Sequence, residues 1–182
     1  SVYEYAKFNR AMTESTAIMG KVTDDMRKTL EEGAKTLSET TKQSASELAD
    51  AYYYLASAGL NVQQSLAALP SVAKFATAGN FELERATELL TNAQTALGLR
   101  MEDSQKNMEQ MTRVSDVLVK ANILATGTTQ EFAEALTNKA AGAMRMFNVP
   151  LEEGVAVLAA YANQGLKGAS AGTALYMVLR DL

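Results

Sequence analysis

Residues 44–51 read Ser44-Ala45-Ser46-Glu47-Leu48-Ala49-Asp50-Ala51, and residues 128–135 read Thr128-Thr129-Gln130-Glu131-Phe132-Ala133-Glu134-Ala135. In both stretches a hydroxyl residue is followed three positions later by a glutamate. This spacing is typical of a capping box, in which the two side chains accept hydrogen bonds from backbone N–H groups that the first helical turn leaves unpaired. We therefore predict that one helix begins after Ser44 and another after Thr128, and that the chain contains an internal repeat.

The match between the two stretches continues downstream. Further matched positions are Asn61 with Asn148, Phe75-Ala76 with Tyr161-Ala162, Gly79 with Gly165, and Ala86-Thr87-Glu88-Leu89 with Gly172-Thr173-Ala174-Leu175. Helix-capping rules alone can produce two similar starts by chance. The agreement beyond the caps favours a repeat over that alternative.

Apolar residues recur at spacings of three and four along the whole chain, which indicates amphipathic helices. β-Branched residues are few and scattered, so no strand is expected. The expected fold is all-α: an alanine-rich multi-helix bundle with two three-helix pseudo-repeats joined by a long helix. Its predicted parts are N-terminal helices in residues 1–43, the first repeat in 44–98, the connecting long helix in 99–127 and the second repeat in 128–182.

Glycine and proline predict where the helices begin and end. Six glycines fall where an apolar stripe stops and are expected at helix C-termini: Gly59, Gly79, Gly98, Gly127, Gly165 and Gly168. Thr23 is the expected N-cap of the second helix, and Pro150 is expected at a helix start. Pro70 lies inside an apolar stripe, so we predict a kink or a break near Leu69.

The composition excludes several classes of site. The chain has no cysteine and no histidine, which rules out disulfides, thiolate or imidazole zinc sites and Ser-His-Asp triads. A net charge of −4 and the lack of any Lys/Arg cluster argue against direct nucleic-acid binding. The longest uncharged run, residues 51–73, is too polar for a membrane span. No targeting signal is present, and a start without Met and a stop within an apolar helical pattern lead us to expect a segment of a longer protein.

Four adjacent carboxylate pairs are candidates for acid–base catalysis: Asp24-Asp25, Glu31-Glu32, Glu102-Asp103 and Glu152-Glu153. Glycoside hydrolysis needs two carboxylates across a cleft, one of them with a raised pKa. These pairs are instead expected at or near helix starts, where negative charge complements the helix dipole.

Two other patterns suggest chemistry only superficially. Ser44 and Thr128 have no candidate base beside them that would activate a nucleophile. The run Gly165-Leu166-Lys167-Gly168 lacks the spacing of a phosphate-binding loop and is expected to be a helix–helix turn. We therefore expect no enzymatic activity, no catalytic residue, no metal and no cofactor.

The three consecutive tyrosines Tyr52-Tyr53-Tyr54 are the most suggestive surface feature. Successive helical residues are about 100° apart, so all three cannot face one core. Tyr52 is in register with Leu48 and Leu55 and is expected to be buried. Tyr53 is expected to point elsewhere, and an exposed aromatic side chain often anchors a partner.

Methionine supplies the second candidate contact surface. Met144 and Met146 flank Arg145, and flexible thioether side chains adapt to varied partners. The predicted partner-contact residues are therefore Tyr53, Met144, Arg145 and Met146. Packing against a neighbouring helix within the chain is the alternative for each of them.

Six segments together carry a resemblance to a known family: Ala17–Gly20, Ser46–Asn61, Arg113–Leu118, Glu152–Ala160, Gly172–Leu175 and Leu179–Leu182. They resemble the core region of phage tail tape measure proteins. The motifs consist mostly of Ala, Leu and Gly, and it is their order and spacing along essentially the whole chain that carry the likeness.

The resemblance implies a virion component of the long-tailed phages. Such proteins are long and largely helical, and several copies lie in the tail lumen. Tube subunits polymerise around them, so that their length sets tail length, and they leave the tube at infection to let DNA pass. The implied partners are further copies of the chain (a homo-oligomer) and phage tail proteins or tail assembly chaperones, with assembly in the bacterial host cytoplasm.

One departure from a simple ruler is visible in the sequence. Glycines interrupt the apolar pattern repeatedly, and no heptad repeat persists. We therefore expect a folded module that docks to tail-end proteins or assembly chaperones, rather than an extended ruler.

Two other classes of protein compete with this interpretation. A helical-repeat adaptor for protein–protein interaction is the main alternative, and it predicts a polar capping repeat at its end. This sequence ends on Leu175, Val178 and Leu182 instead. A membrane-active helical toxin needs a basic helix face or an apolar hairpin, and neither is present.

Overall fold

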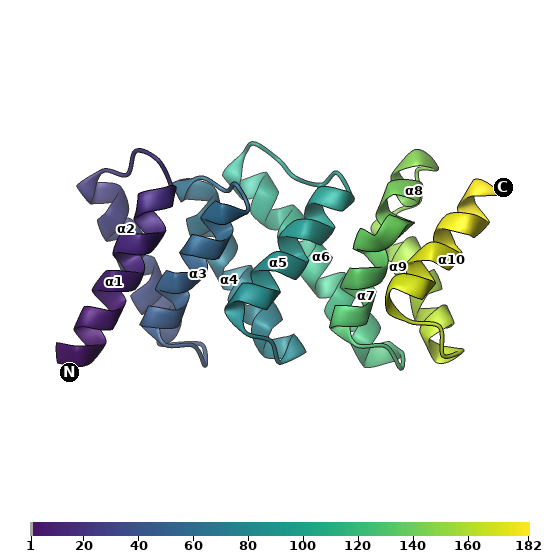
Figure 1. Cartoon of the computed structure of the whole chain (residues 1–182), viewed down its shortest axis with the longest axis horizontal. Coiled ribbons are helices and arrows are strands. Elements are labelled where there is room, and N and C mark those ends of the chain that lie inside the picture. Colours follow the sequence, from purple (N-terminus) through teal and green to yellow (C-terminus); the bar gives the residue numbers. More distant parts are fainter. Residues whose placement is uncertain (1) are drawn as a thin grey trace. The chain divides into compact units, whose positions relative to one another are not determined.

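A computed structural model describes residues 2–182, which are α-helical with no strand among them, as predicted. Figure 1 shows the helices α1 (Val2–Ile18), α2 (Asp24–Ser38), α3 (Ala45–Ser57), α4 (Val62–Gly79), α5 (Leu83–Ala96), α6 (Ser104–Leu124), α7 (Thr129–Ala135), α8 (Ala141–Met146), α9 (Leu151–Asn163) and α10 (Gly168–Arg180). A π-helical segment, η1 (Leu136–Ala140), joins α7 to α8. Within residues 2–182, no helix combines the length and apolarity needed to cross a membrane.

The chain divides into two compact units. The first unit contains Ser1–Glu88 and Glu102–Met108, and the second contains Leu89–Met101 and Glu109–Leu182. α5 and α6 therefore each contribute residues to both units. The predicted limits of the pseudo-repeats stay a prediction.

The core of the first unit is built around α3. Leu48, Tyr52 and Leu55 are fully buried on its inner face, at the spacing of a helical stripe. The hydroxyl of Tyr52 donates to the backbone oxygen of Leu30 on α2 at 3.1 Å. The buried hydroxyl of Ser15 on α1 donates to the backbone oxygen of Ala49 at 2.7 Å. α3 is thus tied to both preceding helices by polar contacts inside an apolar core.

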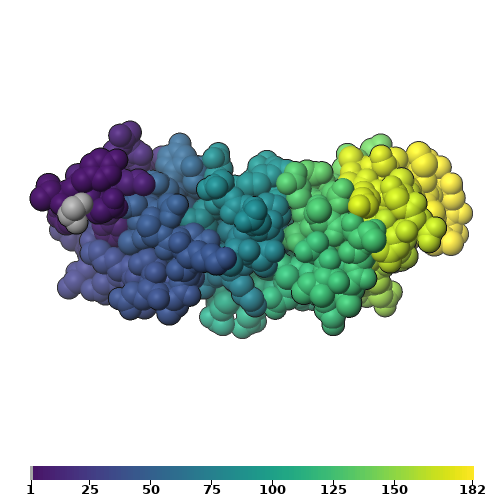
Figure 2. Space-filling view, turned by 90° about the horizontal axis from the view of Figure 1, so that it is seen from below, coloured from purple at the N-terminus to yellow at the C-terminus, as the bar shows by residue number. Residues whose placement is uncertain are grey.

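The core of the second unit forms where α10 packs on α7, η1 and α9. Phe132, Leu136, Leu158 and Leu175 are buried there. Figure 2 shows α10, in yellow, lying against the green surface of the helices that precede it.

The predicted N-caps are confirmed. The Thr23 hydroxyl accepts from the backbone N–H of Met26, and Ser44 and Thr128 each form a complete capping box. A third capping box, which we did not predict, joins Asn61 and Gln64 at the start of α4. Pro150 lies at the N-cap of α9, as predicted.

The predicted helix C-termini are only partly correct. Gly59, Gly98 and Gly165 have positive φ just beyond a helix end, which fits a C-terminal cap. Gly79 also lies at a helix C-terminus, whereas the predictions for Gly127 and Gly168 are wrong. Gly79 is the last residue of α4 and Asn80 takes the left-handed conformation, while Gly127 precedes the N-cap of α7 and Gly168 begins α10.

Of the kink or break predicted near Leu69, the break is wrong, because α4 continues through Pro70 from Val62 to Gly79. A proline ring removes one backbone hydrogen bond and crowds the preceding turn. Here the ring lies on the exposed side, whereas its neighbours Leu69, Ser71 and Val72 are buried. Packing of these neighbours in the core offsets the missing hydrogen bond and keeps the helix continuous.

Candidate partner-contact surfaces

The three consecutive tyrosines on α3 point in different directions, as predicted. Tyr52 is fully buried, Tyr54 is half-buried and Tyr53 is 42% exposed. The rings of Tyr53 and Tyr54 meet edge to face, with centroids 5.8 Å apart and an interplanar angle of 89°. This contact fixes the orientation of Tyr53 while leaving much of its ring in solvent.

Tyr54 borders a groove of about 380 Å³ between α3 and the start of α5. The groove is lined by Lys42, Gln43, Glu47, Asp50, Tyr54, Phe81, Glu82, Leu83 and Glu84. Burial, followed by the negative charge of Glu84, raises the pKa of Tyr54. The lining has four carboxylates and one cation, Lys42, so the groove is acidic. Sequence analysis did not identify it.

Two carboxylates of this acidic groove have different environments. Hydrogen bonds from the backbone N–H and hydroxyl of Ser44 hold the pKa of Glu47 below its usual range. Burial, followed by the negative charge of Glu14, raises the pKa of Asp50. Among residues 2–182, no three acidic side chains are grouped closely enough to hold a metal ion.

The Met144–Met146 candidate surface is divided by the structure. Met144 is only 1% exposed, and a Cβ added at Gly154 on α9 would collide with its side chain. Met144 therefore fills space in the core and is not an exposed contact, which corrects our expectation. Helical residues two positions apart point about 200° apart, so Met144 and Met146 lie on opposite sides of α8 and only Met144 faces inward.

Arg145 and Met146 remain at the surface. The guanidinium of Arg145 lies against Gly98 and donates to the backbone oxygen of Ala96 at 3.5 Å. Met146 is 76% exposed, and the neighbouring Phe147 is also exposed. The end of α8 thus presents an apolar tip next to one cation.

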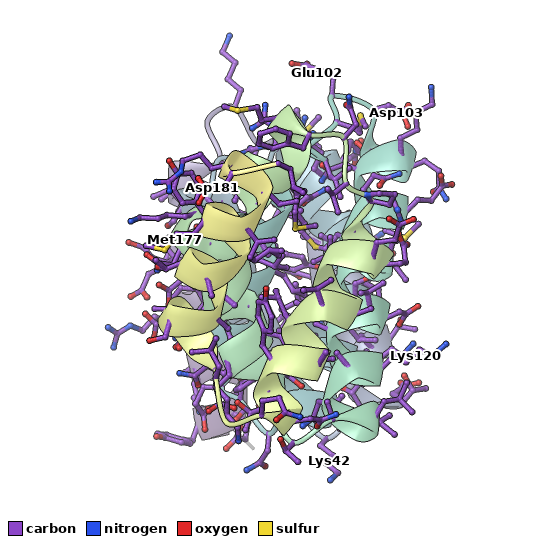
Figure 3. The ribbon with its side chains drawn as sticks, turned by 90° about the vertical axis from the view of Figure 1, so that its right-hand side faces the viewer. Lys42, Glu102, Asp103, Lys120, Met177 and Asp181 are labelled. Carbon is purple, nitrogen blue, oxygen red and sulfur yellow. The ribbon has the colours of Figure 1, made fainter. Side chains whose placement is uncertain are left out.

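A second groove, of about 440 Å³, runs between α6 and α9. Its lining is mostly apolar and small: Val117, Ala121, Leu124, Ala125, Val155, Ala156, Ala159 and Ala160, with Lys120, Glu152 and Asn163. Both helices contribute residues at spacings of three and four, so each presents one face to the groove. Lys120 extends from α6 beside α9 (Figure 3).

Polar contacts join α6 to α9 near both ends of this groove. The Arg113 guanidinium donates to both carboxylate oxygens of Glu152, at 2.7 and 2.6 Å, and lowers the pKa of that carboxyl. The backbone N–H of Thr126 donates to the side-chain oxygen of Asn163 at 3.0 Å. The two helices therefore run in the same direction. The spacing of apolar residues along each helix is detectable in the sequence. The sequence does not show that α6 and α9 share a groove.

The remaining chemical candidates have structural roles. Asp24-Asp25 and Glu152-Glu153 lie in first helical turns, and Asp103 accepts from the backbone N–H of Lys106 at the start of α6. Glu31-Glu32 lies inside α2 rather than at a helix start, which corrects our expectation, and Glu31 pairs with Arg27 at 3.0 Å.

The turn at residues 165–168 connects α9 to α10, as predicted. Its lysine, Lys167, donates to the backbone oxygen of Thr126 at 2.7 Å. The cation is therefore engaged with the chain's own backbone, in a helix–helix turn.

Comparison with known proteins gives two matches. A model of the family described as phage-related minor tail protein matches residues 31–182. A protein named "Tape measure protein" from Pneumococcus phage Dp-1 is 30% identical over 169 residues, which is 93% of this chain and 14% of that protein. The chain thus spans about a seventh of the length of this relative. No solved structure matches it.

Proposed function

Because the chain belongs to the phage-related minor tail protein family, we propose that it is a non-enzymatic structural part of a phage tail. The larger protein would be a tape measure protein that acts in tail assembly and tail length determination. The observation that carries this proposal is the family match over residues 31–182, together with the similarity to a named tape measure protein. The capping roles of Ser44 and Thr128 support the non-enzymatic part of the proposal.

Within the tape measure protein, this segment would act as a folded docking module. A single helix of the same length would extend about 270 Å at ~1.5 Å per residue. The longest helix among the described residues, α6, has 21 residues, and each unit has a buried core of its own. Compact units of this kind favour docking over measuring length.

The proposed partners are further copies of the chain and other tail proteins or assembly chaperones, met in the tail lumen or during assembly in the host. Tyr53 on the first unit and Arg145 with Met146 on the second are the proposed contacts. Exposed aromatic and Arg side chains are enriched where protein partners bind most strongly. Methionine adapts its shape to a partner surface.

An in-frame deletion of residues 23–182 from the phage gene tests the docking role. We expect tails of unchanged length or no tails, viewed by electron microscopy. Tails shortened by a distance approaching ~1.5 Å per deleted residue, or about 240 Å in total, would show that this segment is extended in the ruler. Mass spectrometry of purified wild-type virions tests the broader role, since absence of peptides from this segment would contradict a structural place in the tail.

If the deletion gives no tails, an in-frame duplication of residues 23–182 separates the two roles. A docking module duplicated in the chain leaves tail length unchanged. A ruler segment lengthens the tail by about 240 Å.

A further inference from the structure

The helix that begins at the Thr128 cap is bent in its middle. α7 and α8 have helical backbone angles, but Asn138 has φ −93° and ψ 68°, and Lys139 has φ 86° and ψ −34°. A residue with a Cβ is strained at such a positive φ. Some interaction from outside this helix must therefore stabilise the bend.

The local sequence does not account for the bend. Residues 129–146 contain no proline and one glycine, Gly142, which lies beyond the bend. Phe132, Leu136, Ala140 and Ala143 would form one stripe on a straight helix. α3, which also begins at a capping box, is regular. α3 has 13 residues, whereas α7, η1 and α8 together have 18, from 7, 5 and 6 residues, so the bent segment is five residues longer.

α10 lies directly against the bend. A Cβ added at Gly172 would collide with the backbone oxygen of Ala135 and lie 2.8 Å from the backbone oxygen of Asn138. Only a residue without a side chain lets the two backbones approach this closely. α10 therefore fits the bent helix through its glycine.

The two non-helical residues also contact α10 through their side chains. The Asn138 amide donates to the backbone oxygen of Ala169 at 3.0 Å and to the hydroxyl of Thr173 at 3.3 Å. The Lys139 ammonium lies 5.8 Å from the centre of the Tyr176 ring, within range of a cation–π interaction. The residues of α10 that make these contacts are Ala169, Thr173 and Tyr176. Together with Gly172 they occupy consecutive turns on one face of α10.

We infer that the bend at Asn138–Lys139 is a conformational switch controlled by α10. When α10 is docked, its contacts hold the bent form; when α10 leaves, residues 129–146 become one straight helix. The switch changes both the length of this helix and the apolar face it exposes. It is a property of the chain's own folding and does not depend on the proposed role in the tail.

Replacing Gly172→Ala in the whole chain tests this inference. The added methyl group should displace α10, so that amide hydrogen exchange along α10 becomes at least about tenfold faster. The 13Cα chemical shifts of Asn138 and Lys139 should move to helical values. Faster exchange in α10 with non-helical shifts retained at both residues would overturn the inference, and so would exchange that is unchanged.

Gly142→Ala is the matched control, because a Cβ there meets no atom within 4 Å. This variant should leave the amide exchange of α10 and the 13Cα chemical shifts of Asn138 and Lys139 as they are in the wild-type chain. Lys139→Gly relieves the strain of positive φ and should slow the exchange of α10 amides. Faster exchange in Lys139→Gly would contradict a strained bend held by α10.

If Gly172→Ala unfolds the second unit, the pair Asn138→Ala with Thr173→Val replaces it. This pair removes the side-chain hydrogen bonds without adding an atom at the close contact. Helical shifts at residue 139 would again support the switch, and retained non-helical shifts with faster α10 exchange would overturn it. Because all these readouts use the isolated chain, they are independent of the virion experiments that test the proposed function.

Discussion

The Tyr52 hydroxyl donates a 3.1 Å hydrogen bond to the backbone oxygen of Leu30, linking α3 to α2 inside the first unit. Tyr52→Phe removes this buried hydrogen bond and should lower the free energy of unfolding by about 1–2 kcal/mol. Urea denaturation of the two proteins measures the difference. Tyr53→Phe is the matched control, because that ring is exposed, and it should change stability little. Equal effects of the two substitutions would contradict this role for Tyr52.

Because the Tyr52 hydroxyl is buried, the stability of the first unit should decrease at alkaline pH. Burial raises the pKa of Tyr52 above its usual value, whereas in the unfolded chain tyrosine ionises near pH 10. The contribution of the protonated phenol is fully present below about pH 10 and is lost as the pH rises toward the folded-state pKa. We expect the stability of the wild-type chain to fall more steeply above pH 10 than that of Tyr52→Phe, measured by urea denaturation across this range. Parallel curves would contradict the prediction.

The paired hydrogen bonds between Arg113 and Glu152 predict an acid-sensitive contact between α6 and α9. Glu152→Gln should lower the free energy of unfolding at pH 7 by less than about 1 kcal/mol, because both side chains are partly exposed. The Arg113 partner lowers the pKa of Glu152. The contribution of the Arg113–Glu152 contact to the free energy of unfolding is therefore present above the unfolded-state pKa of Glu152. It is lost as the pH falls through the folded-state pKa. The difference in the free energy of unfolding between the two proteins should therefore be smaller at pH 3 than at pH 7, measured by urea denaturation at both values.

The capping boxes predict equal roles for two distant hydroxyls. Ser44→Ala and Thr128→Ala should each lower the free energy of unfolding by about 1 kcal/mol, because each leaves a backbone N–H of the first turn without its partner. Ser57→Ala, at the exposed C-terminal end of α3, serves as the control and should have little effect. Calorimetric unfolding compares the three variants, and no loss at Ser44 or Thr128 would contradict the capping roles.

Truncating the two methionines beside Arg145 should lower the free energy of unfolding by very different amounts. Met144→Ala opens a cavity in the second unit and should lower the free energy of unfolding by about 2–5 kcal/mol. Met146→Ala removes an exposed side chain and should change it by less than about 0.5 kcal/mol. Thermal unfolding of both variants tests this, and similar losses would contradict the burial of Met144. A loss of partner binding in Met146→Ala without loss of stability would support its proposed contact role.

The sequence predicted the features that depend on local hydrogen bonding. The caps at Thr23, Ser44 and Thr128 are confirmed, because a hydroxyl and the backbone three residues later meet wherever a helix begins. The burial of Tyr52 and the exposure of Tyr53 are confirmed for a similar reason. Helical geometry alone separates them once a stripe is identified.

Features that depend on packing between helices were not predicted. A kink or a break was expected near Leu69 because of Pro70, but burial of the neighbouring residues keeps α4 one continuous helix. The bend at Lys139 was not expected, since its contacts come from α10, more than thirty residues away along the chain. Tertiary contacts also decide that Met144, rather than Met146, faces the core. They decide as well that α6 and α9 line one groove. A single sequence carries no direct signal for these.

The inward orientation of Met144 also gives the methionines different redox reactivities. Peroxide converts an accessible thioether to a polar sulfoxide, whereas a thioether enclosed in a core is protected until the fold opens. Met146 and Met177 lie at the surface (Figure 3 shows Met177 on the outer side of α10) and should be oxidised first, while Met12, Met111 and Met144 are buried. The order in which sulfoxides appear therefore distinguishes an intact core from one that has opened, without any added label.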